Sequence, residues 1–469
     1  MNLNELTISQ SLVGLKKKEF SSLELTKACL RQIKNQELKI NAFVSITEEK
    51  AIEQAKKADL LISKGTNSPL IGVPVSIKDN FCTKNIRTTA SSKVLDDFIP
   101  PFNATVVKLL EEAGIVMLGK TNLDAWAHGS STETSDFGST KNPWNTNFLP
   151  GGSSGGAAAS VASNETVFAI GSETAGSIRQ PASWCGVVGL KPTYGRVSRY
   201  GLIAMVSSLD CPGPIAKSVE DCALVLEVLA GKDSLDATTS DRAVPKYSKS
   251  LNNSLAGIRI GVSDEYFDGV DEEVNEKIQE AVKILEKLGA KIKKVKLFPP
   301  KYAIAVYTIL QRSEVSSNLA RYDGIRYGKD RSYFGEEAKR RIMLGTYTLS
   351  SGYYDQYYNK AQKVRTIIMN DFDKAFKKVD LIVGPTSPST ALPIGSSKNH
   401  PMFGEMSDAL VEPSTIAGLA GINVPCGFSK QRLPIGLQIF GPQFSEERVL
   451  NAAHKYEQTT DWRKYKPSL

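Results

Sequence analysis

Two turns rich in glycine and serine hold the side chains best suited to chemistry. The first, residues 150–159, reads PGGSSGGAAA. It runs into the helix-forming residues 157–162 and then into the apolar stretch 166–170, so a flexible linker does not fit this context. Glycines between packed elements indicate unusual backbone angles or close approach to a ligand. Neither the Walker A pattern nor the dinucleotide fingerprint is present, which argues against phosphate binding.

The second turn, residues 171–181, reads GSETAGSIRQP and also follows a predicted strand. Its small residues at 174–177 allow backbone N–H groups to converge as an oxyanion hole, where one donor contributes about 3–4 kcal/mol in the transition state. Ser177 ends this run. Its hydroxyl can attack a carbonyl carbon if a base takes its proton.

The expected base is a lysine, because histidine is scarce. The chain has three histidines, His128, His400 and His454, and none stands in a zinc-ligand motif, so no metal site is expected. We expect His400 in a loop and His454 on a helix surface. Lys78 ends a predicted buried strand, where desolvation can lower its pKa toward neutrality. Serine–lysine pairs are a variant of serine catalysis.

Short apolar strands alternate with amphipathic helices along the chain. The box Ser21–Glu24 predicts a helix start, and the β-branched alternation of residues 70–79 predicts a strand ending at Lys78. Further expected helices cover 105–113, 218–229, 271–288, 303–321 and most of 335–376, and further expected strands cover 115–118, 166–170, 258–262 and 381–383. This alternation predicts an α/β layered fold.

We expect one large domain over residues 1–469, since the chain shows no repeats and no low-complexity tract. Within it we expect an N-terminal helical part at 1–65 and a catalytic core at 66–230. Residues 231–469 would complete the core and supply substrate-binding helices. The polar stretch 233–253 is expected to be a surface loop.

Composition is that of an ordinary globular protein, with 469 residues, 41% hydrophobic and 23% charged. No apolar run has the length of a membrane span and no secretory signal is visible, so a cytoplasmic location is the default expectation. The six scattered cysteines predict buried free thiols. The net charge of +8 would suit an acidic partner such as RNA, but no basic block is dense enough to demonstrate one.

Four motifs resemble the amidase signature family. They are GVPVSIKDN at 72–80, GGSSGG at 151–156, GSIRQP at 176–181 and GVVGLKPT at 186–193. The resemblance implies an α/β fold with a large mixed sheet covered by helices. It implies Ser177 as the acylated nucleophile, Ser153 in a cis peptide as the relay and Lys78 as the base. Backbone N–H groups near Thr174, Ala175 and Gly176 would hold the oxyanion.

Further blocks resemble the A subunits of tRNA-dependent amidotransferases, a branch of this family. They lie at 191–201, 316–324, 339–346 and 350–354. This resemblance implies a glutaminase that passes ammonia to a B subunit, within a heterotrimer braced by a small C subunit. The B subunit would activate glutamate-charged tRNA with ATP and magnesium, and the chain itself would need no cofactor.

The resemblance also implies residues for glutamine recognition. Arg341 would bind the carboxylate and Asp408 the ammonium, as charge pairing requires, with Tyr307 as a further contact. Arg340 is the alternative to Arg341 if the register shifts by one residue. Ordinary ion pairs are the other explanation for these charges.

The sequence departs from the family pattern at several positions. Ala175 replaces a usual glycine and Glu173 a usual aspartate, while Ala157 and His128 replace serine and methionine. The three catalytic residues are unaffected. Two other hypotheses remain open at this point. One is a stand-alone amidase acting on another small amide, and the other is a non-catalytic scaffold of an RNA or protein complex.

Overall fold

One mixed sheet of eleven strands organises the computed structural model, which describes residues 2–322, 328–398 and 400–468. The strand order is β1-β3-β2-β4-β6-β5-β10-β11-β9-β7-β8. The strands are β1 Phe43–Ile46, β2 Pro74–Lys78, β3 Val116–Thr121, β4 Phe168–Glu173, β5 Val188–Lys191, β6 Cys211–Ala216, β7 Arg259–Val262, β8 Lys291–Lys294, β9 Leu381–Pro385, β10 Ala420–Phe428 and β11 Pro434–Gly441. The predicted α/β class with a large mixed sheet is confirmed.

Parallel pairing at β2 brings the chemical groups to one edge of the sheet. β2 lies between β3 and β4 and runs parallel to both. The carboxyl ends of parallel strands share an edge, so Lys78 at the end of β2 and Glu173 at the end of β4 lie at the same edge. β4, β6, β5, β10, β11 and β9 then follow one another in antiparallel pairs. The sequence had indicated neither β10 nor β11.

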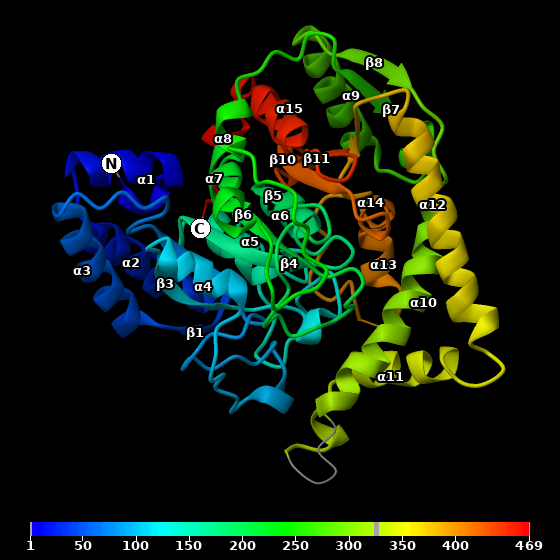
Figure 1. Ribbon diagram of the computed structural model, residues 1–469, viewed down its shortest axis with the longest axis horizontal. Helices are drawn as coiled ribbons and strands as arrows, with labels where there is room; N and C mark the ends of the chain where they lie inside the picture. The colour runs from blue at the N-terminus through cyan, green and yellow to red at the C-terminus, as the bar shows by residue number, and fades with distance from the viewer. Residues whose placement is uncertain (1, 323–327, 399, 469) are drawn as a thin grey trace.

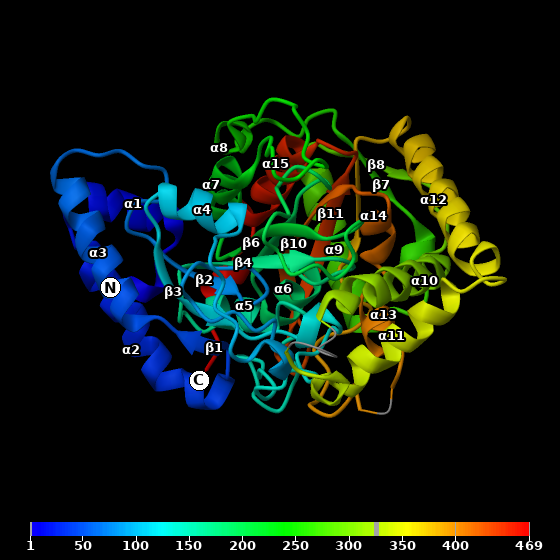
Figure 2. The ribbon, with the colours of Figure 1, turned by 60° about the horizontal axis from the view of Figure 1, so that its bottom comes forward.

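Helices cover both faces and both ends of the sheet. They are α1 Ile8–Lys17, α2 Ser22–Ile40, α3 Glu48–Ser63, α4 Thr105–Glu112, α5 Gly155–Ala162, α6 Arg179–Cys185, α7 Val219–Leu229, α8 Tyr247–Ser250, α9 Glu272–Lys287, α10 Pro300–Leu319, α11 Glu336–Thr348, α12 Lys360–Phe376, α13 Phe403–Ser407, α14 Glu412–Ile416 and α15 Glu446–Gln458. Helices α1–α4 gather beside β1 and β3, and α10–α12 form a wall on the opposite side of the molecule (Figures 1 and 2).

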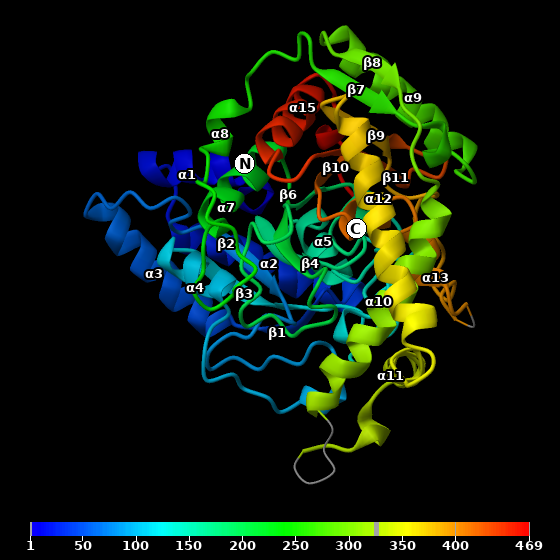
Figure 3. The same cartoon turned by 45° about the vertical axis from the view of Figure 1, so that its right-hand side comes forward.

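Two glycines of β11 show how the central sheet is covered. A Cβ on Gly436 would meet Ser183 of α6, whereas a Cβ on Gly441 would meet Val449 of α15. Since side chains alternate between faces with a period of two, positions five apart face opposite sides. Helix α6 therefore packs on one face and α15 on the other, with α7 beside α15 (Figure 3). Helices α5 and α6 begin just after the two glycine–serine turns, so the packing of these helices on the sheet positions the turns.

Local predictions are mostly confirmed. Ser21 and Glu24 form the capping box that starts α2, and β2 ends at Lys78. Helix α9 buries the face predicted for 271–288. The region 335–376 forms two helices, α11 and α12, with a π-helical turn at Asp355–Asn359 before α12. The block at 316–324 extends beyond residue 322, outside the described residues.

Two predictions about surfaces were wrong. His454 is only 7% exposed, because its position on α15 faces the core rather than solvent. The stretch 233–253 is only partly a surface loop: it contains α8, where Tyr247 is fully buried and accepts a hydrogen bond from Arg196 at 2.8 Å. The cysteines are buried and free, as expected. Among the described residues, no helix is both long and apolar enough to cross a membrane.

Candidate active site

Lys78 occupies a dry position at the end of β2. It is fully buried, and its Nζ donates to Ser153 Oγ at 2.8 Å, to Ser172 Oγ at 3.0 Å and to Ser172 O at 3.1 Å. Burial lowers the pKa of Lys78 to about 7, while the negative charges of Asp124, Asp210 and Glu173 oppose part of that fall. The amine can therefore exchange a proton with Ser153 near neutral pH.

The turn before α5 gives Ser153 its orientation. The Gly152–Ser153 peptide bond is cis, as the family resemblance implies. A Cβ on Gly151 would lie 2.4 Å from Gln180 Oε1, and a Cβ on Gly152 would lie 2.2 Å from Asp124 Oδ2. Any side chain at either position would collide with its neighbours. The glycines therefore serve close backbone packing, as the sequence indicated.

The turn between β4 and α6 carries Ser177, whose side chain is buried. Its carbonyl accepts from the backbone N–H of Ser154 at 3.2 Å, which joins the two glycine–serine turns. Among the described residues the Ser177 hydroxyl makes no hydrogen bond, so Ser153 and Ser177 are not bonded to each other through their side chains. The Lys78–Ser153 contact is formed.

The three residues expected to form the oxyanion hole are held by their other atoms. The Thr174 hydroxyl donates to Asp210 Oδ1 at 2.7 Å, and the Ala175 carbonyl accepts from the Thr415 hydroxyl at 2.6 Å. A Cβ on Gly176 would lie 2.5 Å from Asp408 Oδ1, so only glycine fits beside that carboxylate. Within the described part of the chain, none of the three backbone N–H groups has a hydrogen-bond partner, so they can donate to a substrate oxygen.

A buried ion pair fixes the start of α6. Glu173 accepts two hydrogen bonds from the Arg179 guanidinium, at 2.6 and 2.9 Å, and two from the backbone N–H groups of Ile178 and Arg179. Neither side chain is exposed to solvent. Glutamate in place of the usual aspartate thus spans the turn while its carboxylate stays fully hydrogen-bonded.

The three residues expected to bind substrate lie with Ser177 around one pocket. Its lining comprises Ala127, Gly129, Ser130, Ser177, Met205, Tyr307, Arg341, Gly404, Glu405 and Asp408. Helix α10 supplies Tyr307, α11 supplies Arg341, and Asp408 follows α13. The open space is only about 10 Å³, so a ligand must displace one of the lining side chains.

Arg341, and not Arg340, faces this pocket. The Arg341 side chain is 5% exposed and its Nε donates to Glu337 Oε1 at 2.5 Å. The Arg340 side chain is 37% exposed and pairs with the other oxygen of Glu337. The register of α11 therefore settles which arginine can meet a ligand.

Asp408 presents an unsatisfied carboxylate to the pocket. Ser130 Oγ donates to its Oδ2 at 2.8 Å, while its Oδ1 has no hydrogen-bond partner among the described residues. Burial raises the pKa of Asp408 well above its usual range, and the negative charges of Glu173 and Glu405 raise it further. A cationic group entering the pocket would favour the charged carboxylate.

Several residues around the pocket were missed from the sequence. Glu405 pairs with Arg312 at 3.1 Å, and Glu412 is fully buried with no partner for either oxygen among the described residues. The spacing of Glu405, Asp408 and Glu412 places three carboxylates near one helical face, which was the available signal. The role of these carboxylates depends on nearby arginines from α10 and α11, and no local sequence pattern reveals that proximity.

His128 lies near this site and makes no hydrogen bond to Ser153 or Ser177 among the described residues. His128 is buried, and no hydrogen-bond partner of either ring nitrogen is found in the described part of the chain. Burial lowers the pKa of His128 well below its usual range, and the nearby charge of Arg341 acts in the same direction. No cluster of metal-ligating side chains occurs among the described residues.

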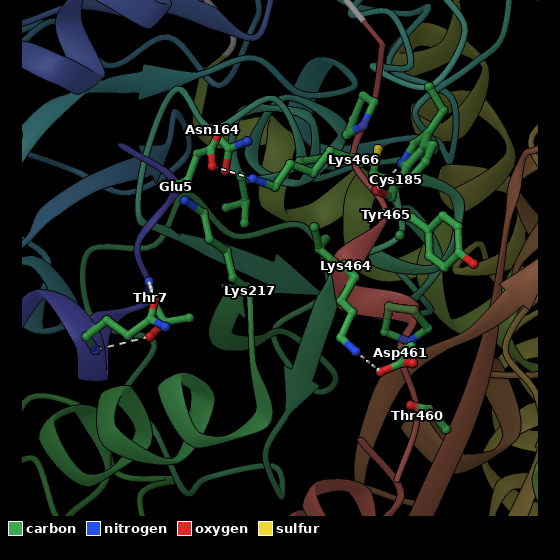
Figure 4. A pocket seen from close by; sticks show the side chains of 18 of the residues that line it. Glu5, Thr7, Asn164, Cys185, Lys217, Thr460, Asp461, Lys464, Tyr465 and Lys466 are labelled. Carbon is green, nitrogen blue, oxygen red and sulfur yellow. Dashed lines mark hydrogen bonds and ion pairs between the residues drawn. The ribbon is translucent and has the colours of Figure 1, made fainter. Parts of the chain in front are cut away.

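A second, larger cavity of about 470 Å³ lies elsewhere, between the N-terminal segment and the C-terminal tail (Figure 4). Its charged groups already have partners within the chain. Lys464 pairs with Asp461 at 2.6 Å, Lys466 pairs with Glu5, and Lys217 donates to the carbonyls of Asn4 and Leu6. None of the expected catalytic residues lines this cavity.

Comparisons with known proteins identify the family. The Amidase family model matches residues 24–450. The glutamyl-tRNA(Gln) amidotransferase A subunit of Thermoanaerobacter pseudethanolicus is 52% identical, covering 98% of this chain and 97% of that protein. Its counterpart from Geotalea daltonii is 50% identical over the full length of both.

Solved structures give the same picture. The crystal structure of the glutamyl-tRNA(Gln) amidotransferase A subunit from Thermotoga maritima is 42% identical with a TM-score of 0.84, covering 98% of this chain and 96% of that one. The peptide amidase of Stenotrophomonas maltophilia has a TM-score of 0.85 at 31% identity, covering 97% of this chain and 96% of that one. The two structures match this fold equally well, but the sequence identity is higher to the amidotransferase A subunit than to the peptide amidase. The chain belongs to the amidase family and, within it, to the glutamyl-tRNA(Gln) amidotransferase A subunits.

Proposed function

We propose that this chain hydrolyses glutamine and supplies the ammonia for conversion of Glu-tRNA(Gln) to Gln-tRNA(Gln). One observation carries the proposal: Ser177 shares its pocket with a cation, Arg341, and a carboxylate, Asp408. An α-amino acid presents the complementary pair of charges, and its side-chain amide can then extend toward Ser177. Tyr307 completes the wall of the pocket.

Proton transfer starts at Lys78. With a pKa near 7, a large fraction of this amine is neutral at neutral pH. The neutral amine takes the proton of Ser153 while Ser153 takes the proton of Ser177. Closing the Ser153–Ser177 contact when substrate binds would complete the relay, since catalytic hydrogen bonds often tighten only in the complex.

Acyl transfer follows in two balanced steps. Ser177 Oγ attacks the amide carbon of glutamine, and the carbonyl oxygen gains negative charge facing the N–H groups of Thr174, Ala175 and Gly176. The tetrahedral intermediate collapses as the C–N bond breaks, and the proton held by Lys78 returns through Ser153 to the leaving ammonia. Water then attacks the ester by the same relay and releases glutamate, which restores the Ser177 hydroxyl.

The remaining steps would belong to partner subunits. The relatives are named as one subunit of an amidotransferase for glutamyl-tRNA(Gln), which supports assembly with other subunits. We propose a B subunit that activates the charged tRNA with ATP and magnesium, and a small C subunit that braces the pair. This chain would meet tRNA mainly through the B subunit.

A stand-alone amidase acting on another small amide is the alternative. The peptide amidase shows that this backbone also serves other amides. The buried Arg341 and Asp408 favour glutamine instead, because opposite charges flanking one small pocket suit an amino acid. The unpartnered Oδ1 of Asp408 would be a desolvation cost without benefit for a neutral amide.

Ammonia release tests the proposal. The purified chain would be assayed with glutamine, alone and with B and C subunits, ATP and glutamate-charged tRNA. We expect release that depends on Ser177 and rises with the partners. If glutamine is not hydrolysed in either setting while another amide is, the stand-alone amidase is correct.

A further inference from the structure

Three consecutive hydroxyl residues, 130–132, join Asp408 to the turn that carries Ser153. The Ser130 hydroxyl donates to Asp408 Oδ2 at 2.8 Å, and the Thr132 hydroxyl donates to the Gly151 carbonyl at 2.8 Å. Between them, the Ser131 backbone N–H donates to Asp124 Oδ2 at 3.0 Å. The segment thus touches the group expected to bind substrate and the loop that carries Ser153.

Asp124 is the common acceptor beneath this segment. Its fully buried carboxylate also accepts from the Thr134 hydroxyl at 2.9 Å and from the Ser131 hydroxyl at 3.3 Å. It packs against Gly152 and Gly129, where added Cβ atoms would lie 2.2 and 2.6 Å from its oxygens. One carboxylate therefore supports both the glycine before Ser153 and the hydroxyl segment.

The segment needs such support because its backbone is strained. Trp126, Ala127 and Thr132 all have positive φ, at 60°, 65° and 65°. Side chains disfavour this region, and such residues persist only where surrounding contacts fix them. The hydrogen bonds from Ser131 to Asp124 lie between Ala127 and Thr132, and the bond from Thr134 lies just after Thr132.

We propose that Asp124 is a positioning residue for the nucleophile relay, holding the 130–132 segment and, through it, the Gly151–Ser153 turn against Lys78. The proposal rests on the hydrolytic function proposed above, but on no particular substrate. The carboxylate also acts on Lys78 electrostatically, together with Asp210 before β6 and Glu173 at the end of β4.

An isosteric substitution isolates this role. In Asp124→Asn, one oxygen becomes an amide NH2 that opposes the donors around it, so the segment loses its register, and the negative charge near Lys78 is lost as well. Removing that charge disfavours protonated Lys78, so the acid limb of reactivity should move to lower pH. Misplacement of a catalytic group by about 1 Å can cost about 100-fold.

The readout is labelling of Ser177 by a fluorophosphonate probe, measured on the full chain across pH. We expect the plateau labelling rate of Asp124→Asn to fall about 10–100-fold, with its acid limb at lower pH. The matched control is Asp221→Asn, a buried aspartate on α7 that accepts from the Ser9 backbone at 3.2 Å, remote from Lys78. The Asp221→Asn variant should have the same plateau labelling rate and the same acid limb of the pH profile as the unsubstituted chain.

The outcomes separate the two proposals. A plateau within threefold of the unsubstituted chain, or a lower plateau with an unmoved acid limb, would assign Asp124 to folding alone and overturn the inference. Because the probe needs no glutamine, an unsubstituted chain that is labelled but does not hydrolyse glutamine would defeat the proposed function and leave this test intact.

Discussion

The catalytic turns and the substrate wall are built in different ways. Lys78 ends β2, Ser153 lies in the turn before α5, and Ser177 lies in the turn after the neighbouring strand β4. Hydrogen bonds and close glycine contacts fix all three. Tyr307 and Arg341, by contrast, come from separate helices of the α10–α12 wall. Apolar side chains pack these helices together, and the pair of Arg312 with Glu405 joins α10 to α13.

This difference teaches that reactivity and selectivity are separable in this chain. Glycine-rich turns between buried strands hold reactive groups with little freedom to move, which preorganises the chemistry. Charged side chains on separate helices can be substituted without disturbing those strands. Substitutions on the two sides should therefore give different kinetic signatures.

Loss of the nucleophile should have the largest effect. Ser177→Ala removes the attacking oxygen, and comparable deletions in serine hydrolases lower kcat by about 10⁴–10⁶-fold. The check is ammonia release from glutamine, with folding followed by circular dichroism. Ser160→Ala, which removes a buried hydroxyl of α5 bonded to Ser76, should stay within a few-fold. Equal losses in both variants would contradict the assigned role.

Removing the positive charge of Arg341 should selectively lower the activity toward glutamine. Arg341→Met loses a charge-assisted contact, for which we expect kcat/KM for glutamine to fall about 10–100-fold. Fluorophosphonate labelling of Ser177 should be nearly unchanged. Arg340→Met, one residue away on the exposed side, is the control and should behave as the parent chain does. A larger effect at Arg340 would mean that α11 is rotated in the working enzyme.

The pH dependence of kcat should report the protonation of Lys78. Lys78 must be neutral to accept a proton and its pKa is about 7, so protonation removes activity as pH falls. Below the pKa, each further pH unit should lower kcat by about tenfold. A flat profile between pH 5 and 8 would show that Lys78 is not the base.

The pH dependence of KM should report the protonation of Asp408, and it should be the smallest of these effects. The pKa of Asp408 is raised, so this carboxyl stays protonated to higher pH than usual and then binds an ammonium poorly. KM for glutamine should rise several-fold as pH falls. Asp408→Asn should remove this dependence, measured by initial rates across pH. A persistent rise in that variant would point to another group.

Two elements of the catalytic side could be predicted because their signals are local: the strand ending at Lys78 and the helix that follows the first glycine–serine turn. Helix α6, which follows the second turn, was not predicted. Strands β10 and β11 were not predicted, although β4 and β9 of the same antiparallel half were. Apart from each other, their partners are β5 and β9, which lie far away in the sequence, so no local pattern reveals those pairings. His454 was misplaced for the same reason, since its burial depends on tertiary packing of α15.

The wall could be reached only through family resemblance. Nothing local distinguishes Arg341 from Arg340; burial separates them only after α11 packs on α10. The carboxylates Glu405 and Glu412 and the supporting Asp124 were missed. The pairing of Glu405 with Arg312 and the close approach of Asp124 to Gly152 bring together separate segments, which no local pattern reveals.

Acylation of Ser177 by glutamine is the central claim, and mass spectrometry tests it most directly. The chain would be mixed with glutamine, quenched in acid and digested. We predict a glutamyl ester on the peptide that carries Ser177, absent from Ser177→Ala. An adduct on another residue, or hydrolysis by Ser177→Ala at the parental rate, would contradict the claim.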